Sequence, residues 1–103
     1  MKINWADVPA KQKSELHTYR QVKCGPLSLV LHEYSPGWKL EWHSHPGAEF
    51  RHVLQGRMRV WIEGEVIEQA EGESVFVPGG AKHMSAVPAQ KTVTLTLYLR
   101  SAS

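Results

Sequence analysis

Residues 37–56 read GWKLEWHSHPGAEFRHVLQG, and residues 72–87 read GESVFVPGGAKHMSAV. Glycines and prolines frame both segments, and such residues mark turns that fix where neighbouring side chains point. Three imidazoles and one carboxylate within these frames form a nitrogen and oxygen donor set that suits a divalent transition metal. The four donor residues are His43, His45, Glu49 and His83. The two segments therefore predict one metal site that joins distant parts of the chain.

Outward from these segments, apolar and polar residues alternate with the period of two that is typical of β-strands. The expected strands cover residues 27–34, 38–45, 49–55, 57–62, 66–67, 75–77, 83–87 and 92–99. Turns are expected at 36–37, 46–47, 63–64 and 78–80, and only the first fifteen or so residues are expected to hold a helical turn. Many short strands with regular turns are typical of an all-β sandwich or barrel.

Strand phase indicates how the donor residues meet. His43 and His45 are two residues apart, so in one strand they share a face, which must be the interior if both are to reach one ion. Glu49 lies beyond a Pro-Gly turn, so phase does not strictly carry across to it, but its own strand can place it beside the pair. His83 is expected to arrive from another strand, just past a tight glycine turn.

The two segments resemble the two sequence motifs of the cupin superfamily. The resemblance implies one all-β, jelly-roll (double-stranded β-helix) cupin domain over residues 1–103, with motif one at 37–56 and motif two at 72–87. In cupins the two histidines and the glutamate of the first motif, with the histidine of the second, bind the metal, so the resemblance implies the ligands His43, His45, Glu49 and His83. The family's second motif usually ends in asparagine, where this chain has Val87. That position is not a ligand in the family, so the difference concerns a supporting hydrogen bond.

Four protein ligands leave two positions of an octahedral shell for water, substrate or dioxygen. A divalent ion with one carboxylate keeps a charge of about +1, which suits an anionic, oxygen-chelating ligand. Fe, Mn, Ni, Cu, Co and Zn all accept such a ligand set. Polarisation of a carbonyl, activation of water and oxygen chemistry at a redox metal all remain open.

Arg51 and Tyr98 are the candidate substrate-binding residues. Arg51 shares strand phase with Glu49, so it is expected to clamp a substrate carboxylate, or else to lie at the rim or in an ion pair. Tyr98 would donate a hydrogen bond into the cavity if the threonine-rich face of residues 92–99 is the inner one, but the apolar face of that segment could equally be inner. His17 is expected to be an ordinary surface histidine.

Composition agrees with a small globular domain. Hydrophobic residues make up 42% of the 103 residues and charged residues 21%, and the net charge of +2 comes without a basic block that would indicate nucleic acid. A lone cysteine, Cys24, fits a reducing compartment. With no signal-peptide pattern and no stretch of membrane-spanning length, a cytoplasmic protein without membrane contact is expected. We expect a homodimer, because open strand edges and exposed aromatic residues favour pairing of two copies and because cupins typically dimerise.

Three functions fit this sequence. We expect a metal-dependent oxidoreductase, similar to cupin dioxygenases, that acts on a small oxygen-chelating substrate. One alternative is a non-redox lyase or isomerase that acts on a sugar acid, as some compact cupins do. The other is a non-catalytic module that binds a small molecule. The complete set of four donors favours an enzyme, since a binding barrel need not keep them, and no helix-turn-helix segment supports a regulator.

Overall fold

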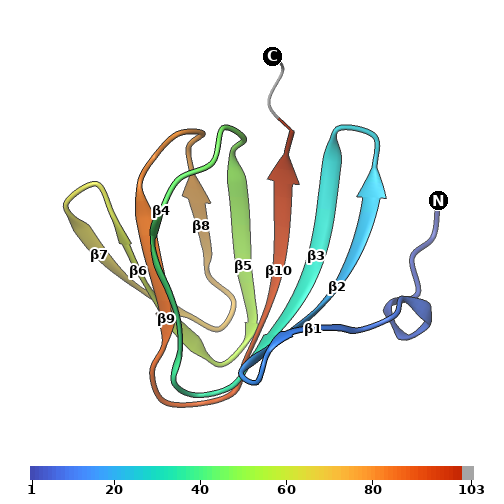
Figure 1. Cartoon of the computed structure of the whole chain (residues 1–103), viewed down its shortest axis with the longest axis horizontal. Helices are drawn as coiled ribbons and strands as arrows, with labels where there is room; N and C mark the ends of the chain where they lie inside the picture. Colours follow the sequence, from blue (N-terminus) through green and yellow to red (C-terminus); the bar gives the residue numbers. More distant parts are fainter. Residues whose placement is uncertain (101–103) are drawn as a thin grey trace.

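The structure is a computed structural model that describes residues 1–100. Two antiparallel sheets face each other across the core (Figure 1). The larger sheet has the order β1 (Lys11–Ser14), β2 (His17–Cys24), β3 (Leu27–Tyr34), β10 (Thr92–Leu99), β5 (Glu49–Gln55) and β8 (Ser74–Val77). The smaller sheet has the order β4 (Trp38–His43), β9 (His83–Val87), β6 (Arg57–Ile62) and β7 (Glu65–Ala70). A 3-10 turn, η1 (Trp5–Asp7), precedes them.

The order of the strands confirms the predicted all-β jelly roll. From β3 onward the chain passes repeatedly between the two sheets, so neighbouring strands come from distant segments, and β10 lies between β3 and β5. Apolar side chains of both sheets meet between them: Val53 and Val77 from the larger sheet pack with Met58 and Val60 from the smaller. Polar side chains, among them Glu49, Arg51 and His83, are also buried between the sheets.

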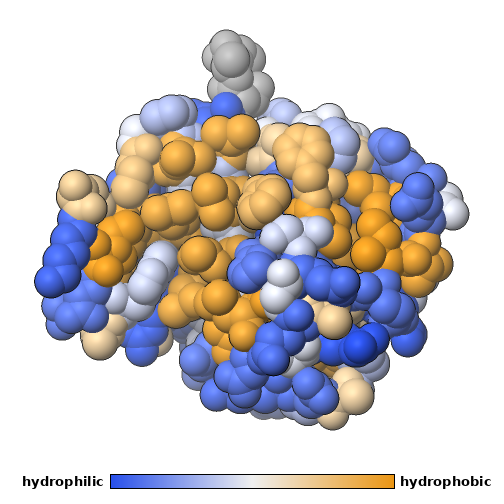
Figure 2. Space-filling model, turned by 180° about the vertical axis from the view of Figure 1, so that it is seen from behind, coloured by the Kyte–Doolittle hydropathy of each residue, from blue (hydrophilic) through white to orange (hydrophobic). Residues whose placement is uncertain are grey.

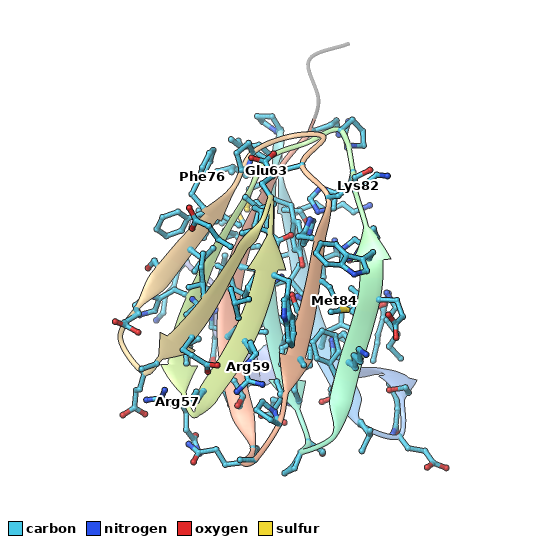
Figure 3. All side chains as sticks on the ribbon, turned by 90° about the vertical axis from the view of Figure 1, so that its left-hand side faces the viewer. Arg57, Arg59, Glu63, Phe76, Lys82 and Met84 are labelled. Atoms are coloured by element: carbon cyan, nitrogen blue, oxygen red, sulfur yellow. The ribbon has the colours of Figure 1, made fainter. Side chains whose placement is uncertain are left out.

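Alternation decides which side chains point inward, as predicted. On β6, Met58, Val60 and Ile62 are buried, whereas the intervening Arg59 and Trp61 are only partly buried and face outward. Figure 3 looks onto the outer face of the smaller sheet, where Arg59 and Met84 are labelled. The turn between β6 and β7 has positive φ at both Glu63 (45°) and Gly64 (81°). Two such residues make the hairpin turn whose twist matches its strands.

Most predicted strands are confirmed, and the strands at 27–34, 49–55, 57–62, 83–87 and 92–99 have the predicted bounds. Strands β1 and β2 were not predicted. The inner face of β2 carries His17, Tyr19, Gln21 and Lys23, so the apolar alternation that reveals a strand is missing there. Within residues 1–100, no helix is long and apolar enough to cross a membrane.

Candidate metal centre

Three histidines meet between the two sheets. His43 ends β4 and His83 begins β9, and these residues lie directly opposite each other in the strand pairing, with ring centroids 4.1 Å apart. His45 joins them from the loop after β4. One nitrogen from each of the three rings lies within 4.8 Å of the other two. The structure therefore brings together all three predicted histidine donors.

Backbone carbonyls fix the orientation of each of these rings. Nδ1 of His43 lies 2.8 Å from the carbonyl oxygen of Glu41, Nδ1 of His45 lies 2.8 Å from that of Gly47, and Nδ1 of His83 lies 2.9 Å from that of Ala81. A carbonyl oxygen only accepts, so each Nδ1 carries the proton and donates it. The lone pair of each neutral ring is then on Nε2. Such outer hydrogen bonds orient the imidazoles of metal sites.

Glu49, the fourth predicted donor, begins β5 and is almost fully buried. Its Oε1 lies 3.1 Å from Nε2 of His45 and 3.7 Å from Nε2 of His83. Its Oε2 accepts from Arg51, at 3.0 Å from Nε and 2.6 Å from the terminal nitrogen. Arg51 also donates to Ser85 on β9 at 2.9 Å. One carboxylate oxygen is thus held by Arg51, and the other faces the histidines.

Burial and neighbouring charges shift the pKa values of the residues at the centre. Burial would raise the pKa of Glu49, but the neighbouring His83 and Arg51 outweigh this effect and lower it to about 2. The carboxylate of Glu49 raises the pKa of His83. Burial lowers the pKa of His43. Glu49 is therefore ionised at neutral pH, as a metal-binding carboxylate must be.

A loop, and not a strand, positions His45. The expected strand to residue 45 was too long: β4 ends at His43, after an irregularity in its pairing with β9. The loop is instead fixed by its neighbour, because the backbone N–H of Gly80 donates to the carbonyl of His45 at 2.8 Å. A Cβ on Gly79 would lie only 2.3 Å from the carbonyl oxygen of Pro46. Glycine at 79 therefore lets the two motif loops touch.

The donor set fits a divalent transition metal. Nε2 of His83 is enclosed and has no hydrogen-bond partner among residues 1–100. An unpaired buried polar atom is costly, and a metal ion would satisfy it. The three Nε2 atoms and Oε1 of Glu49 could hold such an ion.

A cavity of about 560 Å³ opens beside the candidate centre. This volume is typical of sites for small molecules. Tyr98 and Arg51 both line it, together with His32 and Tyr34 from β3. The threonine-rich face of β10 is the inner one, since Thr92, Thr94 and Thr96 are fully buried. Tyr98, Arg51 and Glu49 thus all line the cavity, and Arg51 is bound there to Glu49.

His17 is not a surface residue, contrary to expectation. It is only 7% exposed, and its ring lies 4.6 Å from that of Tyr34. Its Nε2 is 2.8 Å from Nδ1 of His32, whose Nε2 is 3.1 Å from the hydroxyl of Tyr98. The sequence signal for this arrangement was weak, because it depends on strand β2, which the polar inner face concealed.

Comparisons with known proteins agree with this architecture. A family model for the cupin domain matches residues 30–98. An acireductone dioxygenase from Rhodopseudomonas palustris (strain TIE-1) is 31% identical over 84 residues, which cover 72% of this chain and 51% of that protein. The chain therefore spans about half the length of this relative.

Two solved structures show the same fold. An RmlC-like cupin from Shewanella frigidimarina superimposes with a TM-score of 0.85 at 16% identity, over 95% of this chain and 88% of that one. Oxalate decarboxylase from Bacillus subtilis superimposes with a TM-score of 0.84 at 20% identity, over 98% of this chain and 29% of that one. With both sequence motifs, the jelly roll and the family match in agreement, the chain belongs to the cupin family.

Proposed function

We propose that this cupin binds one divalent transition metal and acts as a dioxygenase-like oxidoreductase on a small, oxygen-chelating substrate. The ligands would be His43, His45, Glu49 and His83. The observation that carries the proposal is the meeting of three imidazoles whose Nδ1 atoms are all bound to carbonyls, which leaves three Nε2 lone pairs beside an ionised carboxylate. Nε2 of His45 lies 3.1 Å from Oε1 of Glu49, and Nε2 of His83 is enclosed without a partner among residues 1–100, so one metal ion would satisfy both nitrogens.

The surrounding residues support this centre in distinct ways. The carbonyls of Glu41, Gly47 and Ala81 hold the rings, and Arg51 holds Oε2 of Glu49 so that Oε1 faces them. A bound metal would supply a Lewis-acidic or redox-active point for an anionic oxygen ligand. Arg51 acts through Glu49 in this proposal, because its guanidinium donates to Glu49, to Ser85 and to the sulfur of Met58. A contact with a substrate carboxylate stays a prediction.

The substrate would occupy the cavity beside Tyr98. The hydroxyl of Tyr98 would donate to, or accept from, a polar group of the substrate there. The similarity to an acireductone dioxygenase, at 31% identity, supports the choice of dioxygenase chemistry and makes acireductone the first substrate to test. Non-redox chemistry on a sugar acid and simple binding are the competing outcomes.

Metal analysis with and without His45 tests this function. In protein purified without a histidine tag, we expect near-stoichiometric metal in the wild type and loss of most of it in His45→Ala, with the fold retained by circular dichroism. His52→Ala is the matched control, because His52 hydrogen-bonds Ser74 away from the cavity. Full metal content in His45→Ala would contradict the ligand assignment.

Oxygen uptake distinguishes the reaction classes. The iron-, manganese- or nickel-loaded protein should consume dioxygen with an acireductone or a related enediol, and His45→Ala should not. Conversion of a sugar acid without oxygen uptake would favour the non-redox alternative. Metal binding with neither activity would favour a binding module.

We also propose that the outer face of the larger sheet joins two copies of the chain. Seen from behind, apolar side chains gather over this face (Figure 2). They include Phe50, paired with Phe76 on β8, which are 44% and 57% exposed. Exposed apolar patches of this kind mark interaction sites. Sedimentation should show a dimer that Phe50→Ser/Phe76→Ser weakens. Val66→Ser, at an exposed position of β7, is the control and should leave the dimer unchanged. A monomeric wild type would contradict this proposal.

A further inference from the structure

A row of three side chains crosses the cavity wall from strand β2 to strand β10. Nε2 of His17 lies 2.8 Å from Nδ1 of His32, and Nε2 of His32 lies 3.1 Å from the hydroxyl of Tyr98. The row is laid down by the pairing of β2 with β3 and of β3 with β10. At one end Tyr98 lines the cavity beside His45, with ring centroids 6.2 Å apart. At the other end His17 follows strand β1, whose residues are all exposed.

The chemistry of imidazole restricts the row to two proton arrangements. A neutral ring carries one proton, and each hydrogen bond needs one donor and one acceptor. If Nδ1 of His32 donates to His17, then Nε2 of His32 must accept from Tyr98, and the proton of His17 lies on Nδ1. If Nε2 of His32 donates to Tyr98, then Nδ1 must accept from Nε2 of His17. In both arrangements the two rings carry the proton on the same nitrogen type.

The two arrangements give the hydroxyl of Tyr98 opposite hydrogen-bonding roles toward the cavity. In the first, the hydroxyl proton points to His32, so Tyr98 offers only lone pairs to a ligand. In the second, the oxygen accepts from His32, so the hydroxyl proton is available to a ligand. We propose that His17, His32 and Tyr98 form a proton relay between solvent beside β1 and a ligand bound next to the metal centre. This relay rests on the proposed metal-dependent function, because it assigns the acid–base partner of the same site.

The proton transfer is balanced, and both imidazole rings are neutral before and after it. The hydroxyl of Tyr98 gives its proton to a basic atom of the ligand, and the proton on Nε2 of His32 replaces it. Nδ1 of His32 then takes the proton from Nε2 of His17, and a proton from solvent adds to Nδ1 of His17. One proton has passed from solvent to ligand, both rings are again neutral, and no group is oxidised or reduced. The reverse order removes a proton from the ligand.

The surroundings keep both rings neutral at pH 7. Burial, and then the charge of Lys13, lower the pKa of His17 to about 4. Burial, followed by the charges of His17 and Arg51, lowers the pKa of His32 to about 3, although the carboxylate of Glu49 opposes this. Neutral rings can change tautomer, which a permanently charged ring cannot. His17 keeps 7% exposure and lies beside the exposed strand β1, which is the route to solvent that the relay requires.

Nitrogen NMR of the histidines tests the relay without a substrate. The full chain, labelled with ¹⁵N in histidine and loaded with Zn²⁺, is compared at pH 7 with Tyr98→Phe and Tyr34→Phe, and signals are assigned by single His→Phe substitutions. In the wild type, both rings should be neutral, and the ratio of the Nδ1–H tautomer to the Nε2–H tautomer should be the same for His17 as for His32. Tyr98→Phe removes the last member, so it should change the populations of His17 and His32 together. Tyr34→Phe removes a neighbouring hydroxyl that is outside the row and should change neither.

Three results would overturn the relay. Opposite tautomers of the two rings in the wild type would contradict the shared arrangement. A change at His32 alone in Tyr98→Phe, or no change at either ring, would reduce the row to a static brace. Zinc content is measured on the same samples, so a failure of the metal centre is seen separately from a failure of the row. His17→Phe keeps a ring that can stack on Tyr34, so the variant used for assignment should remain folded.

Discussion

Two groups of imidazoles lie at the cavity, and they are held differently: backbone carbonyls orient those of the metal centre, whereas side chains contact those of the row. In the candidate metal centre, His43, His45 and His83 each donate from Nδ1 to a carbonyl, which cannot exchange roles. In the row, His17 and His32 contact a second imidazole and a hydroxyl, which can both donate and accept.

The comparison shows how one residue type serves two purposes in one small cavity. Carbonyl acceptors occupy Nδ1 and leave the same nitrogen, Nε2, for a metal on all three rings. Partners with both donor and acceptor character leave the tautomer free, as a proton relay requires. The two regions meet at Tyr98, whose ring lies near both His32 and His45.

The largest expected effect comes from removing the charge that supports the metal end. In Arg51→Ala, Glu49 would remain buried and ionised without its partner, so the free energy of unfolding should fall by about 3–5 kcal/mol. Metal affinity should fall roughly 10- to 100-fold, as for other outer supports of metal ligands. Urea denaturation and metal titration measure the two losses.

Arg59→Ala is the matched control for Arg51→Ala. Arg59 pairs with Glu68 at the surface, where ion pairs contribute little, so its loss should leave metal affinity unchanged. Equal effects of the two substitutions would show that Arg51 has no special connection with the centre.

Acid should lower the stabilising contribution of the row, whereas it should increase that of His83 at the metal end. The folded-state pKa values of His17 and His32, about 4 and about 3, lie below the ordinary value of 6.5. Below pH 6.5 the unfolded chain therefore binds protons that the folded protein does not bind, so the free energy of unfolding decreases as the pH is lowered. The expected decrease is about 2 kcal/mol for each ring between pH 7 and pH 5. The pKa of His83 is raised by Glu49, so its contribution instead falls as pH increases.

Thermal unfolding of the metal-free protein at pH 7 and pH 5 measures this difference. His17→Phe/His32→Phe should lose less stability on acidification than the wild type does. Glu49 does not interfere in this range, because its stabilising contribution is lost only between its ordinary pKa of 4.5 and about 2. An equal loss in both proteins would mean that the row is not the acid-sensitive region.

A smaller effect is expected where the two motif loops touch. In Gly79→Ala the new Cβ would meet the carbonyl oxygen of Pro46, so the loop that carries His45 must shift, at a cost of about 1–3 kcal/mol. Metal affinity should fall with it, whereas the tautomers of the row should not change. Gly64→Ala is the control: its added Cβ would meet no atom within 4 Å, but the φ of 81° disfavours any L side chain, so it should lower stability and leave metal affinity unchanged. Unchanged metal affinity in Gly79→Ala would show that the loop contact does not position His45.

The two regions differ also in how far the sequence predicted them. The donor types, the glycine frames of both segments and the resemblance to cupins predicted that His43, His45, Glu49 and His83 meet, since each segment carries its own local pattern. Strand alternation predicted most of the jelly roll for a similar local reason. The end of β4 at His43 was not predicted, because the contact of Gly80 with His45 is made between distant segments.

The row could not be predicted because it has no local pattern. His17, His32 and Tyr98 are far apart in sequence and meet only through the register of three strands. The inner face of β2 is polar, so neither the strand nor the burial of His17 was evident. Whether the apolar or the threonine-rich face of β10 points inward likewise depended on tertiary packing.

Elemental analysis of the untagged protein beside His43→Ala/His83→Ala tests the central claim most directly. Both substitutions remove imidazoles of the metal centre and leave the row intact. We predict near-stoichiometric transition metal in the wild type, and loss of nearly all of it in the variant with its β-sheet spectrum retained. Equal metal content in the two folded proteins, or none in either after reconstitution, would contradict the account.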